Sequence, residues 1–278
     1  MSGNFSSHNN NVKRAFCDSP LISIITVVYN GQEFLEETIL SIANQTYQGI
    51  EYIIIDGGSS DGTVDIIKKY EHVIDSWVSE SDEGIYDAMN KGAKLATGSH
   101  LGFLNASDMY FTDAIQHVVN AISKNDFDYC FAPAIVRTES GQDIFTAHPI
   151  HNFVYQQGQY MGMPAPHIST FIKVQVFRAM GGYDLSFLLS SDFDLLLRLT
   201  KDSQNMQSLE QPIGAFRLGG VSGSYKTHID NFYVFKKHKM HFLRRLFVVM
   251  YFTARTFLAK NLSTKMVKYT QRYFRKTN

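Results

Sequence analysis

The chain has 278 residues, of which 44% are hydrophobic and 19% are charged. This composition is typical of a folded globular protein and excludes an intrinsically disordered chain. The two cysteines, Cys17 and Cys130, are too few for a disulfide framework and suit a reducing compartment. The first eleven residues lack a basic start followed by an apolar run, so no secretory signal is expected.

The charge is unevenly distributed along the chain. Residues 226–278 hold thirteen of the 26 Lys and Arg residues but only one of the 26 acids, Asp230. The formal net charge of zero therefore hides a basic C-terminal end and an acidic remainder. This asymmetry predicts an anionic partner for the basic end, either a membrane surface or a nucleic acid.

Residues 1–19 are predicted to be a disordered tail, and the following part alternates apolar runs with helical patterns. The apolar runs that predict buried strands are residues 21–28, 52–55, 74–78 and 101–104. The patterns that predict helices are residues 33–44, 63–70 and 84–96. The alternation predicts an α/β protein with a Rossmann-like, mostly parallel sheet and helices on both of its faces.

The alternation of strand and helix patterns changes after residue 125. Antiparallel strands are predicted at residues 129–136 and 143–147, and a long irregular loop at residues 148–166. A further helix at residues 184–200 and strands at residues 206–220 follow. We therefore predict an α/β domain over residues 20–225 and a basic, amphipathic helical extension over residues 226–278.

Polar side chains follow each of the first four predicted strands, where an open α/β sheet binds its ligands. Tyr29 and Asn30 follow the first strand, and the next three strands are followed by Asp56, Asp82 and Asp108. Neither a dinucleotide fingerprint nor a P-loop is present. The acids instead indicate hydrogen bonds to a nucleotide and a divalent cation that bridges its diphosphate, with Asp108 as the natural metal ligand.

Four segments in this order resemble the motifs of family 2 glycosyltransferases with the GT-A fold: residues 24–30, 56–63, 82–92 and 104–108. The similarity is greatest to the bacterial subgroup that builds capsule, O-antigen and exopolysaccharide, and it covers about residues 21–199. The resemblance implies an inverting enzyme that uses Mn²⁺ or Mg²⁺. Such an enzyme moves a sugar from a nucleotide-diphosphate sugar, with a UDP-sugar favoured, to a hydroxyl of a lipid-linked saccharide.

The resemblance also implies roles for individual residues. The donor-binding candidates share positions at or near the strand ends: Val27, Tyr29, Asn30, Asp56, Asp82, Asn90, Lys91 and Ser107. Asp108 matches the last acid of the family's D-x-D-like motif, which binds the metal together with the donor diphosphate. Asn105 and Ser107 stand where acids are frequent in that motif.

Residues 191–199 resemble the family's E-D-x-D helix start, in which Asp192 matches the general base. The acceptor hydroxyl must lose a proton as it attacks the anomeric carbon, and a carboxylate within hydrogen-bond reach removes that proton. His167, Asp194 and His228 are further candidates for acceptor or diphosphate contacts. Structural alternatives are an ion pair between Asp194 and Arg198, four residues apart, and a packing role for His228.

The basic end favours lipid as its partner. Its uncharged run, residues 246–254, is far shorter than the ~20 residues that span a bilayer, whereas a helix lying in the interface suits its aromatic and basic residues. Nucleic acid is not expected, because no recognition module accompanies the charge. The alternative is packing on the domain or on a second subunit in a homodimer. We therefore expect a cytoplasmic enzyme, peripheral on the inner face of the cell membrane.

Two other functions remain open on the sequence. A sugar nucleotidyltransferase would need a glycine-rich basic loop directly after the first strand, where Tyr29, Asn30 and Gly31 stand instead. A non-catalytic scaffold of a polysaccharide assembly complex is consistent with the departures at Ser107 and Ser191. Metal-dependent binding of nucleotide sugars separates the enzyme from the scaffold.

Overall fold

The computed structural model describes residues 4–7, 19–150, 163–202, 205–218 and 225–261. Its centre is an eight-stranded sheet with the order β1-β4-β3-β2-β5-β10-β7-β11. The four middle strands β4, β3, β2 and β5 are parallel, which confirms the predicted sheet type. In spatial order the strands are β1 (Asn4–Ser7), β4 (Ser76–Ser79), β3 (Ile50–Asp56), β2 (Ile22–Val28), β5 (His100–Asn105), β10 (Thr170–Lys173), β7 (Tyr129–Phe131) and β11 (Met206–Ser208).

A smaller sheet has the order β6-β12-β8-β9. Its strands are β6 (Met109–Tyr110), β12 (Gly214–Arg217), β8 (Ala134–Arg137) and β9 (Asp143–Ala147). The strand predicted at residues 129–136 is in fact two, because the chain leaves the large sheet after β7 and enters the small one at β8. Pro133 lies at this break, and proline cannot donate a ladder hydrogen bond.

Part of the expected N-terminal tail is ordered into the sheet. Asn4–Ser7 form β1, which pairs with β4 in an antiparallel manner. The prediction of a wholly disordered tail is therefore wrong at these four residues, whose alternation was too short to stand out in the sequence. Most of the predicted loop at residues 148–166 lies outside the described residues.

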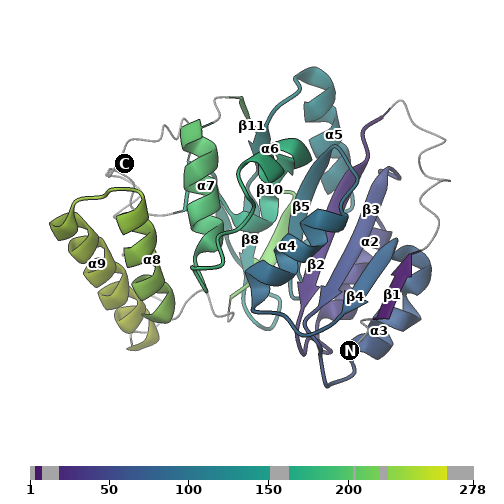
Figure 1. Ribbon diagram of the computed structural model, residues 1–278, viewed down its shortest axis with the longest axis horizontal. Helices are drawn as coiled ribbons and strands as arrows, with labels where there is room; N and C mark the ends of the chain where they lie inside the picture. Colours follow the sequence, from purple (N-terminus) through teal and green to yellow (C-terminus); the bar gives the residue numbers. More distant parts are fainter. Residues whose placement is uncertain (1–3, 8–18, 151–162, 203–204, 219–224, 262–278) are drawn as a thin grey trace.

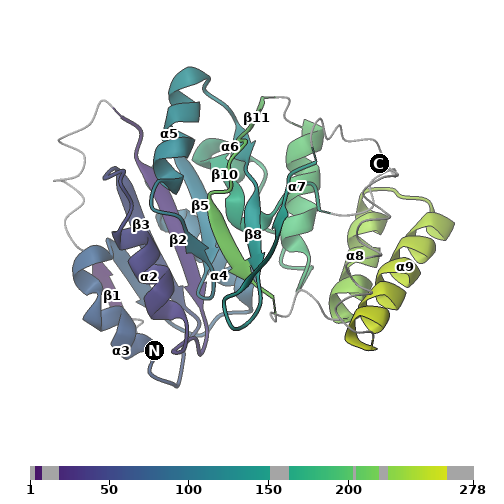
Figure 2. The same cartoon turned by 180° about the vertical axis from the view of Figure 1, so that it is seen from behind.

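Helices cover both faces of the large sheet (Figures 1 and 2). One face carries α2 (Leu35–Ala43), α3 (Thr63–Lys69) and α5 (Ala114–Lys124). The other carries α4 (Ile85–Leu95), α6 (Val174–Ala179) and α7 (Ser191–Asp202). Two short 3-10 turns, η1 (Glu71–Val73) and η2 (His167–Ser169), complete this part.

The mostly apolar sequences of the middle strands follow from burial on both faces. Every residue of β2 is buried, with Ile24 in the core under α2 and Ile25 in the core under α4. The fit under α4 is close, because a Cβ at Gly92 would lie 2.4 Å from Cγ2 of Ile25. Any larger residue at position 92 would push α4 off the sheet, and with it the loop that precedes this helix.

The C-terminal helices α8 (Tyr225–Lys237) and α9 (Phe242–Asn261) form a hairpin at one end of the molecule, beyond α7 (Figures 1 and 2). A third core joins them to the domain, in which Phe193 and Leu197 of α7 meet Val234 and Phe235 of α8. None of the helices within the described residues is long and apolar enough to cross a membrane.

Candidate active site

The loops after β2 and β3 are joined to each other by hydrogen bonds. Asn30 adopts a left-handed backbone, with φ of 48°, and its N–H donates to Ser59 Oγ at 2.7 Å. The Ser60 N–H donates to Asn30 Oδ1 at 2.9 Å, and the Gly31 N–H to Thr63 Oγ1 at 2.9 Å. Asn30 therefore supports the shape of the strand-end loops, and its amide oxygen is already occupied.

Asp56 is the anchor of the second strand end. Its side chain has no exposed surface, and its carboxylate accepts hydrogen bonds from the Ser59 N–H, the Ser59 hydroxyl and the Ser79 hydroxyl. Both carboxylate oxygens are thus engaged. The structure places Asp56 beneath the site, where it orders the loop of residues 57–60.

Beside this anchor lie Tyr29, Gly57 and Asp82, which we call the cradle. Tyr29 is 68% exposed, and Asp82 is half-buried after β4. Between them is Gly57, where a Cβ would lie 2.5 Å from Asp82 Oδ2 and 3.4 Å from Cδ2 of Tyr29. The three residues come from the ends of β2, β3 and β4, so parallel strands bring an aromatic ring and a carboxylate to one place, as predicted from their strand-end positions.

Asp108 occupies the end of β5 and is 5% exposed. Burial raises the pKa of its carboxyl to about 7, although bonds from Arg217, Asn105 and Ser107 act in the opposite direction. Nearby, Oδ1 of Asn105 is buried without a hydrogen-bond partner in the described part of the chain. A desolvated carboxylate beside an unsatisfied amide oxygen is suited to a hard divalent cation, which binds oxygen ligands.

The Asp108 loop is held by an arginine that the sequence did not single out. Arg217 on β12 donates to the Ser107 carbonyl at 3.1 Å and to Glu37 Oε2 at 2.7 Å. Within the ranges that the structure describes, no group of three or more His, Cys, Asp or Glu side chains gathers as a metal site. A cation at Asp108 would thus need oxygens from the bound ligand as well.

Asp192 lies at the start of α7, half-buried, in a cluster of aromatic side chains. The Tyr86 hydroxyl on α4 donates to its Oδ1 at 2.8 Å, and the Phe193 N–H donates to the same oxygen at 2.8 Å. Burial lowers the pKa of His167, while the charge of the nearby Asp192 acts in the opposite direction. The structure thus brings together Asp192 and His167, two residues that the sequence named separately.

His167 and Asn90 both bind to Tyr183. His167 Nε2 and the Tyr183 hydroxyl lie 2.7 Å apart, and the His167 ring stacks on Phe103. The Asn90 amide bonds both the N–H and the carbonyl of Tyr183, each at 2.9 Å. Asn90 therefore uses its oxygen and one amide hydrogen to hold the protein backbone, and its predicted donor contact stays a prediction.

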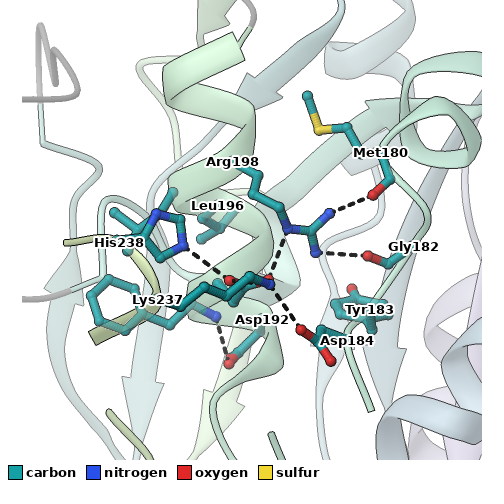
Figure 3. A network of polar contacts seen from close by, with 12 residues as sticks. Met180, Gly182, Tyr183, Asp184, Asp192, Leu196, Arg198, Lys237 and His238 are labelled. Atoms are coloured by element: carbon teal, nitrogen blue, oxygen red, sulfur yellow. Dashed lines mark hydrogen bonds and ion pairs between the residues drawn. The ribbon is translucent and has the colours of Figure 1, made fainter. Parts of the chain in front are cut away.

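Asp194 of α7 belongs to a different set of contacts, with Arg198 of the same helix and with Lys237 and His238 at the end of α8; Figure 3 shows these three partners. Its side chain has no exposed surface and accepts from Arg198 Nε at 2.8 Å, confirming the predicted ion pair. Lys237 Nζ and His238 Nε2 each lie 2.9 Å from Asp194 Oδ1. Both oxygens are used within the protein, so the expectation of an acceptor contact at Asp194 is not met in this structure.

Three other candidates have internal roles. His228 bonds Thr256 Oγ1 at 2.9 Å across the α8–α9 hairpin, and Val27 is buried in the core under α4. Lys91 pairs with Glu80 at 3.0 Å and with Asp87 at 3.2 Å, so it ties the loop after β4 to α4. Asp87 also accepts the Glu83 N–H at the start of α4.

Sequence reasoning missed Tyr86 and Tyr183 as site residues. Tyr86 was visible inside the motif of residues 82–92, but nothing in its local spacing pointed to Asp192, 106 positions away. Tyr183 carried no signal at all. The hydroxyl of a buried tyrosine usually has a hydrogen-bond partner, and this general tendency does not identify the partner from the sequence.

Solved structures share this architecture. Staphylococcus aureus TarS 1–349 in complex with UDP aligns with a TM-score of 0.60 at 14% identity, covering 88% of this chain and 73% of that one. The mannosyltransferase PcManGT of Pyrobaculum calidifontis, in complex with GDP-Man and Mn²⁺, aligns with a TM-score of 0.55 at 14% identity, covering 79% and 63%. At these identities the likeness shows the fold alone, which is the GT-A fold of glycosyltransferases.

The sequence comparison is more specific. The model of Glycosyl transferase family 2 matches residues 23–181. An uncharacterized glycosyltransferase of Mycobacterium tuberculosis is 32% identical over 183 residues, 65% of this chain and 69% of the relative. A PGL/p-HBAD biosynthesis glycosyltransferase of Mycobacterium bovis is 29% identical over 185 residues, 65% and 70%. The chain belongs to glycosyl transferase family 2 and is a glycosyltransferase.

Proposed function

We propose that the protein is an inverting glycosyltransferase that moves a sugar from a nucleotide-diphosphate sugar to a hydroxyl of a lipid-linked saccharide in bacterial surface polysaccharide synthesis. The observation that carries this proposal is the state of Asp192. One of its oxygens is held by Tyr86 and Phe193, whereas its Oδ2 makes no hydrogen bond with the residues that the structure describes. A half-exposed carboxylate with one open oxygen is suited to accept a proton.

The proposed reaction is a single displacement. The acceptor hydroxyl gives its proton to Asp192 Oδ2 as its oxygen forms a bond to the anomeric carbon. The bond from that carbon to the diphosphate breaks on the opposite face, and its electron pair leaves with the nucleoside diphosphate. Attack from the face opposite the leaving group inverts the anomeric configuration.

The donor half is assigned to the strand ends. Tyr29 and Asp82 line the cradle over Gly57, and we assign the nucleotide base and ribose to it, with Asp56 and Asn30 supporting the loops. A UDP-sugar is favoured. The TarS complexes with UDP and UDP-GlcNAc support a uridine nucleotide, whereas the mannosyltransferase complex contains GDP-Man.

Mn²⁺ or Mg²⁺ would be held by the Asp108 carboxylate and Asn105 Oδ1, with Ser107 beside them. When bound, such an ion neutralises charge on the departing diphosphate. The fit is supported by the chemistry of the residues, since both donors are oxygens and the Asn105 oxygen lacks a partner in the described chain. Arg217 keeps this loop in place through the Ser107 carbonyl.

Binding of the nucleotide sugar is expected to require Mn²⁺ and to weaken in acid. The raised pKa of Asp108, about 7, means that this carboxyl is protonated below neutrality and must lose its proton to bind a cation. From pH 8 to pH 6 the ionised fraction falls about tenfold, and Mn²⁺-dependent affinity should fall by roughly the same factor. Calorimetric titration with a panel of UDP-, GDP- and dTDP-sugars, with and without Mn²⁺, measures this.

Asp108→Asn should abolish the Mn²⁺ dependence, whereas the exposed Asp113→Asn, which removes a nearby surface carboxylate, should keep it. The folded-state pKa of Asp108 lies above its unfolded value, so its contribution to stability is lost as pH rises through about 7. In the absence of metal, the Tm of Asp108→Asn should therefore be higher than that of the wild type at pH 8. A wild type that binds none of the nucleotide sugars would refute the proposed donor class.

We further propose that the α8–α9 hairpin rests on an anionic membrane, which would bring the enzyme to a lipid-linked acceptor on the cytoplasmic face. An exposed apolar stripe runs along α9: Leu243, Leu246, Phe247 and Met250. The inner side of α9 contributes Val248 to the third core. An apolar helix face within a strongly basic segment is typical of a helix that lies in a lipid interface.

The protein should sediment with vesicles that contain phosphatidylglycerol and only weakly with pure phosphatidylcholine vesicles. The difference between the two should be larger at low salt. The double variant Leu243→Glu and Phe247→Glu should lose at least about tenfold in affinity, because it places two charges in the apolar interface. Ile144→Glu on β9 is the matched control, since Ile144 is also an exposed apolar residue. The membrane assignment would be contradicted if the wild type bound no lipid and instead formed a dimer that the double variant dissociated.

A further inference from the structure

We propose that Tyr86 is a positioning residue for Asp192, holding one carboxylate oxygen so that the other is presented to the acceptor hydroxyl. This inference rests on the proposed function of Asp192 as the base. The motif at residues 82–92 was expected to contact only the donor. The inference adds a role for this motif beside the acceptor.

The two bonds that Asp192 accepts differ in origin but share one oxygen. The first comes from the Phe193 N–H, within the start of α7, at 2.8 Å. The second comes from Tyr86 on α4, also at 2.8 Å. A single local bond leaves a carboxylate free to rotate, and a second donor from another helix removes that freedom. Because both bonds end on Oδ1, the proton-accepting atom is fixed as Oδ2.

The direction of the Tyr86 bond is constant. Tyr86 is 7% exposed, and its pKa is raised well above the usual value, first by burial and then by the charge of Asp192. The phenol therefore keeps its proton throughout the working pH range and donates it to the carboxylate. A donor to the ionised carboxylate stabilises the charged form, which is the form that a general base requires.

A second layer of contacts keeps the Tyr86 ring in place. The Tyr183 ring packs against it with centroids 5.2 Å apart. Asn90, four residues after Tyr86 and thus on the same side of α4, clamps the backbone of Tyr183 at both its N–H and its carbonyl. A Cβ at Gly182 would lie 2.6 Å from Asn90 Oδ1, so the turn before Tyr183 is fitted to this clamp.

The start of α4 links the two halves of the site. Gly84 has φ of 117°, a conformation that favours glycine, and its N–H donates to Asp82 Oδ1 at 2.9 Å. The helix begins directly afterwards at Ile85. Asp82 beside the nucleotide cradle and Tyr86 beside the base are therefore only four residues apart, on either side of one turn.

Tyr86→Phe tests the proposal, because it removes only the hydroxyl. We expect kcat to fall about 10- to 100-fold, the value of one hydrogen bond to a charged group, with the donor KM unchanged. The acid limb of the pH–rate profile should move to higher pH, since the ionised base has lost a donor. The substrate is the nucleotide sugar that shows the largest Mn²⁺-dependent binding in the panel, and its hydrolysis is measured as released nucleotide.

The pH profile must be read against the other titratable groups around Asp192. These are His167 from η2, Tyr183, and Asp230 from α8. Burial keeps His167 neutral at pH 7 by lowering its pKa, and Tyr183 keeps its proton because its pKa is raised well above the usual value. None of these groups is changed in Tyr86→Phe, so a shift of the acid limb between variant and wild type reports on Asp192.

Tyr52→Phe is the matched control. Tyr52 is also buried, and its hydroxyl bonds Thr26 Oγ1 at 3.1 Å in the core, away from Asp192. It should lose stability as Tyr86→Phe does but keep kcat. Wild-type kcat in Tyr86→Phe, with Asp192→Asn inactive, would overturn this inference and leave the proposed function standing. An active Asp192→Asn would overturn both.

Discussion

Asp192→Asn is expected to lower sugar transfer about a thousandfold while leaving nucleotide-sugar binding unchanged, because general base catalysis contributes about 10²- to 10⁴-fold. The amide has the size of the carboxylate, and its oxygen can still accept from Tyr86. It cannot take the proton of the acceptor hydroxyl at neutral pH. The loss should therefore fall on kcat, with calorimetric affinity for the donor and Mn²⁺ equal to that of the wild type.

The control for this variant lies on the same helix. Asp202 ends α7, its side chain is 55% exposed, and its nearest cation is Lys201 at 3.8 Å. Asp202→Asn removes one carboxylate from α7 but should retain full activity. Wild-type transfer in Asp192→Asn would show that the base is another group. Loss of donor binding would instead place Asp192 in the donor half of the site.

Asp194→Asn is expected to cause the largest loss of stability, about 3 kcal/mol, because breaking a buried ion pair leaves a charge uncompensated. Asp194 is fully buried, and Arg198 beside it is held by the Met180 and Gly182 carbonyls as well (Figure 3). Lys237 is partly exposed and can turn to water, which limits the loss. Urea unfolding followed by circular dichroism measures the difference.

The network also predicts loss of stability in acid. Burial alone would raise the pKa of Asp194, but bonds from His238 and Lys237 and the charge of Arg198 outweigh it and lower the pKa. A lowered pKa in the folded state adds stability at pH values above the pKa of the unfolded state. This stability is lost as the pH falls through the pKa of the folded state. The contacts join α7 to the end of α8, so the α8–α9 hairpin should loosen first in acid.

Asp184→Asn provides the comparison for Asp194→Asn. Asp184 pairs with the same Lys237 at 2.8 Å, but both side chains are partly exposed, and exposed pairs contribute at most about 1 kcal/mol. Equal destabilisation by the two variants would mean that burial of Asp194 is not what makes the network stabilising. Limited proteolysis between the domain and α8 should distinguish the two variants in the same way.

The parallel core of the sheet could be predicted because its cause is local. A strand buried on both faces is mostly apolar, and β2 and β3 show this in consecutive residues apart from a few buried polar ones: Ser23, Thr26, Glu51 and Asp56. Parallel strands then place their carboxyl ends together, so Tyr29, Asp82 and Asp108 were expected at one edge of the sheet from position alone. The small sheet was only half predicted, since the break at Pro133 sends β7 and β8 into different sheets.

The functions of the individual side chains were harder to predict, for a physical reason. Asn90 was expected to bind the donor, yet it binds the Tyr183 backbone, 93 positions along the chain. Asp194 was expected near the acceptor, and it is taken up by Lys237 and His238. An amide or a carboxylate can satisfy its hydrogen bonds with a ligand or with the protein, and local spacing does not distinguish the two.

Local sequence patterns determined the fold class, the strand ends and the residue types gathered there, because apolar periodicity and turn chemistry act over a few residues. Only the tertiary structure decided which of those polar groups stay open to a ligand. Tyr86 meets Asp192 across 106 positions, and His238 meets Asp194 across 44. Such contacts depend on how α4, α7 and α8 pack on the sheet, and that packing is settled by the whole core rather than by any one segment.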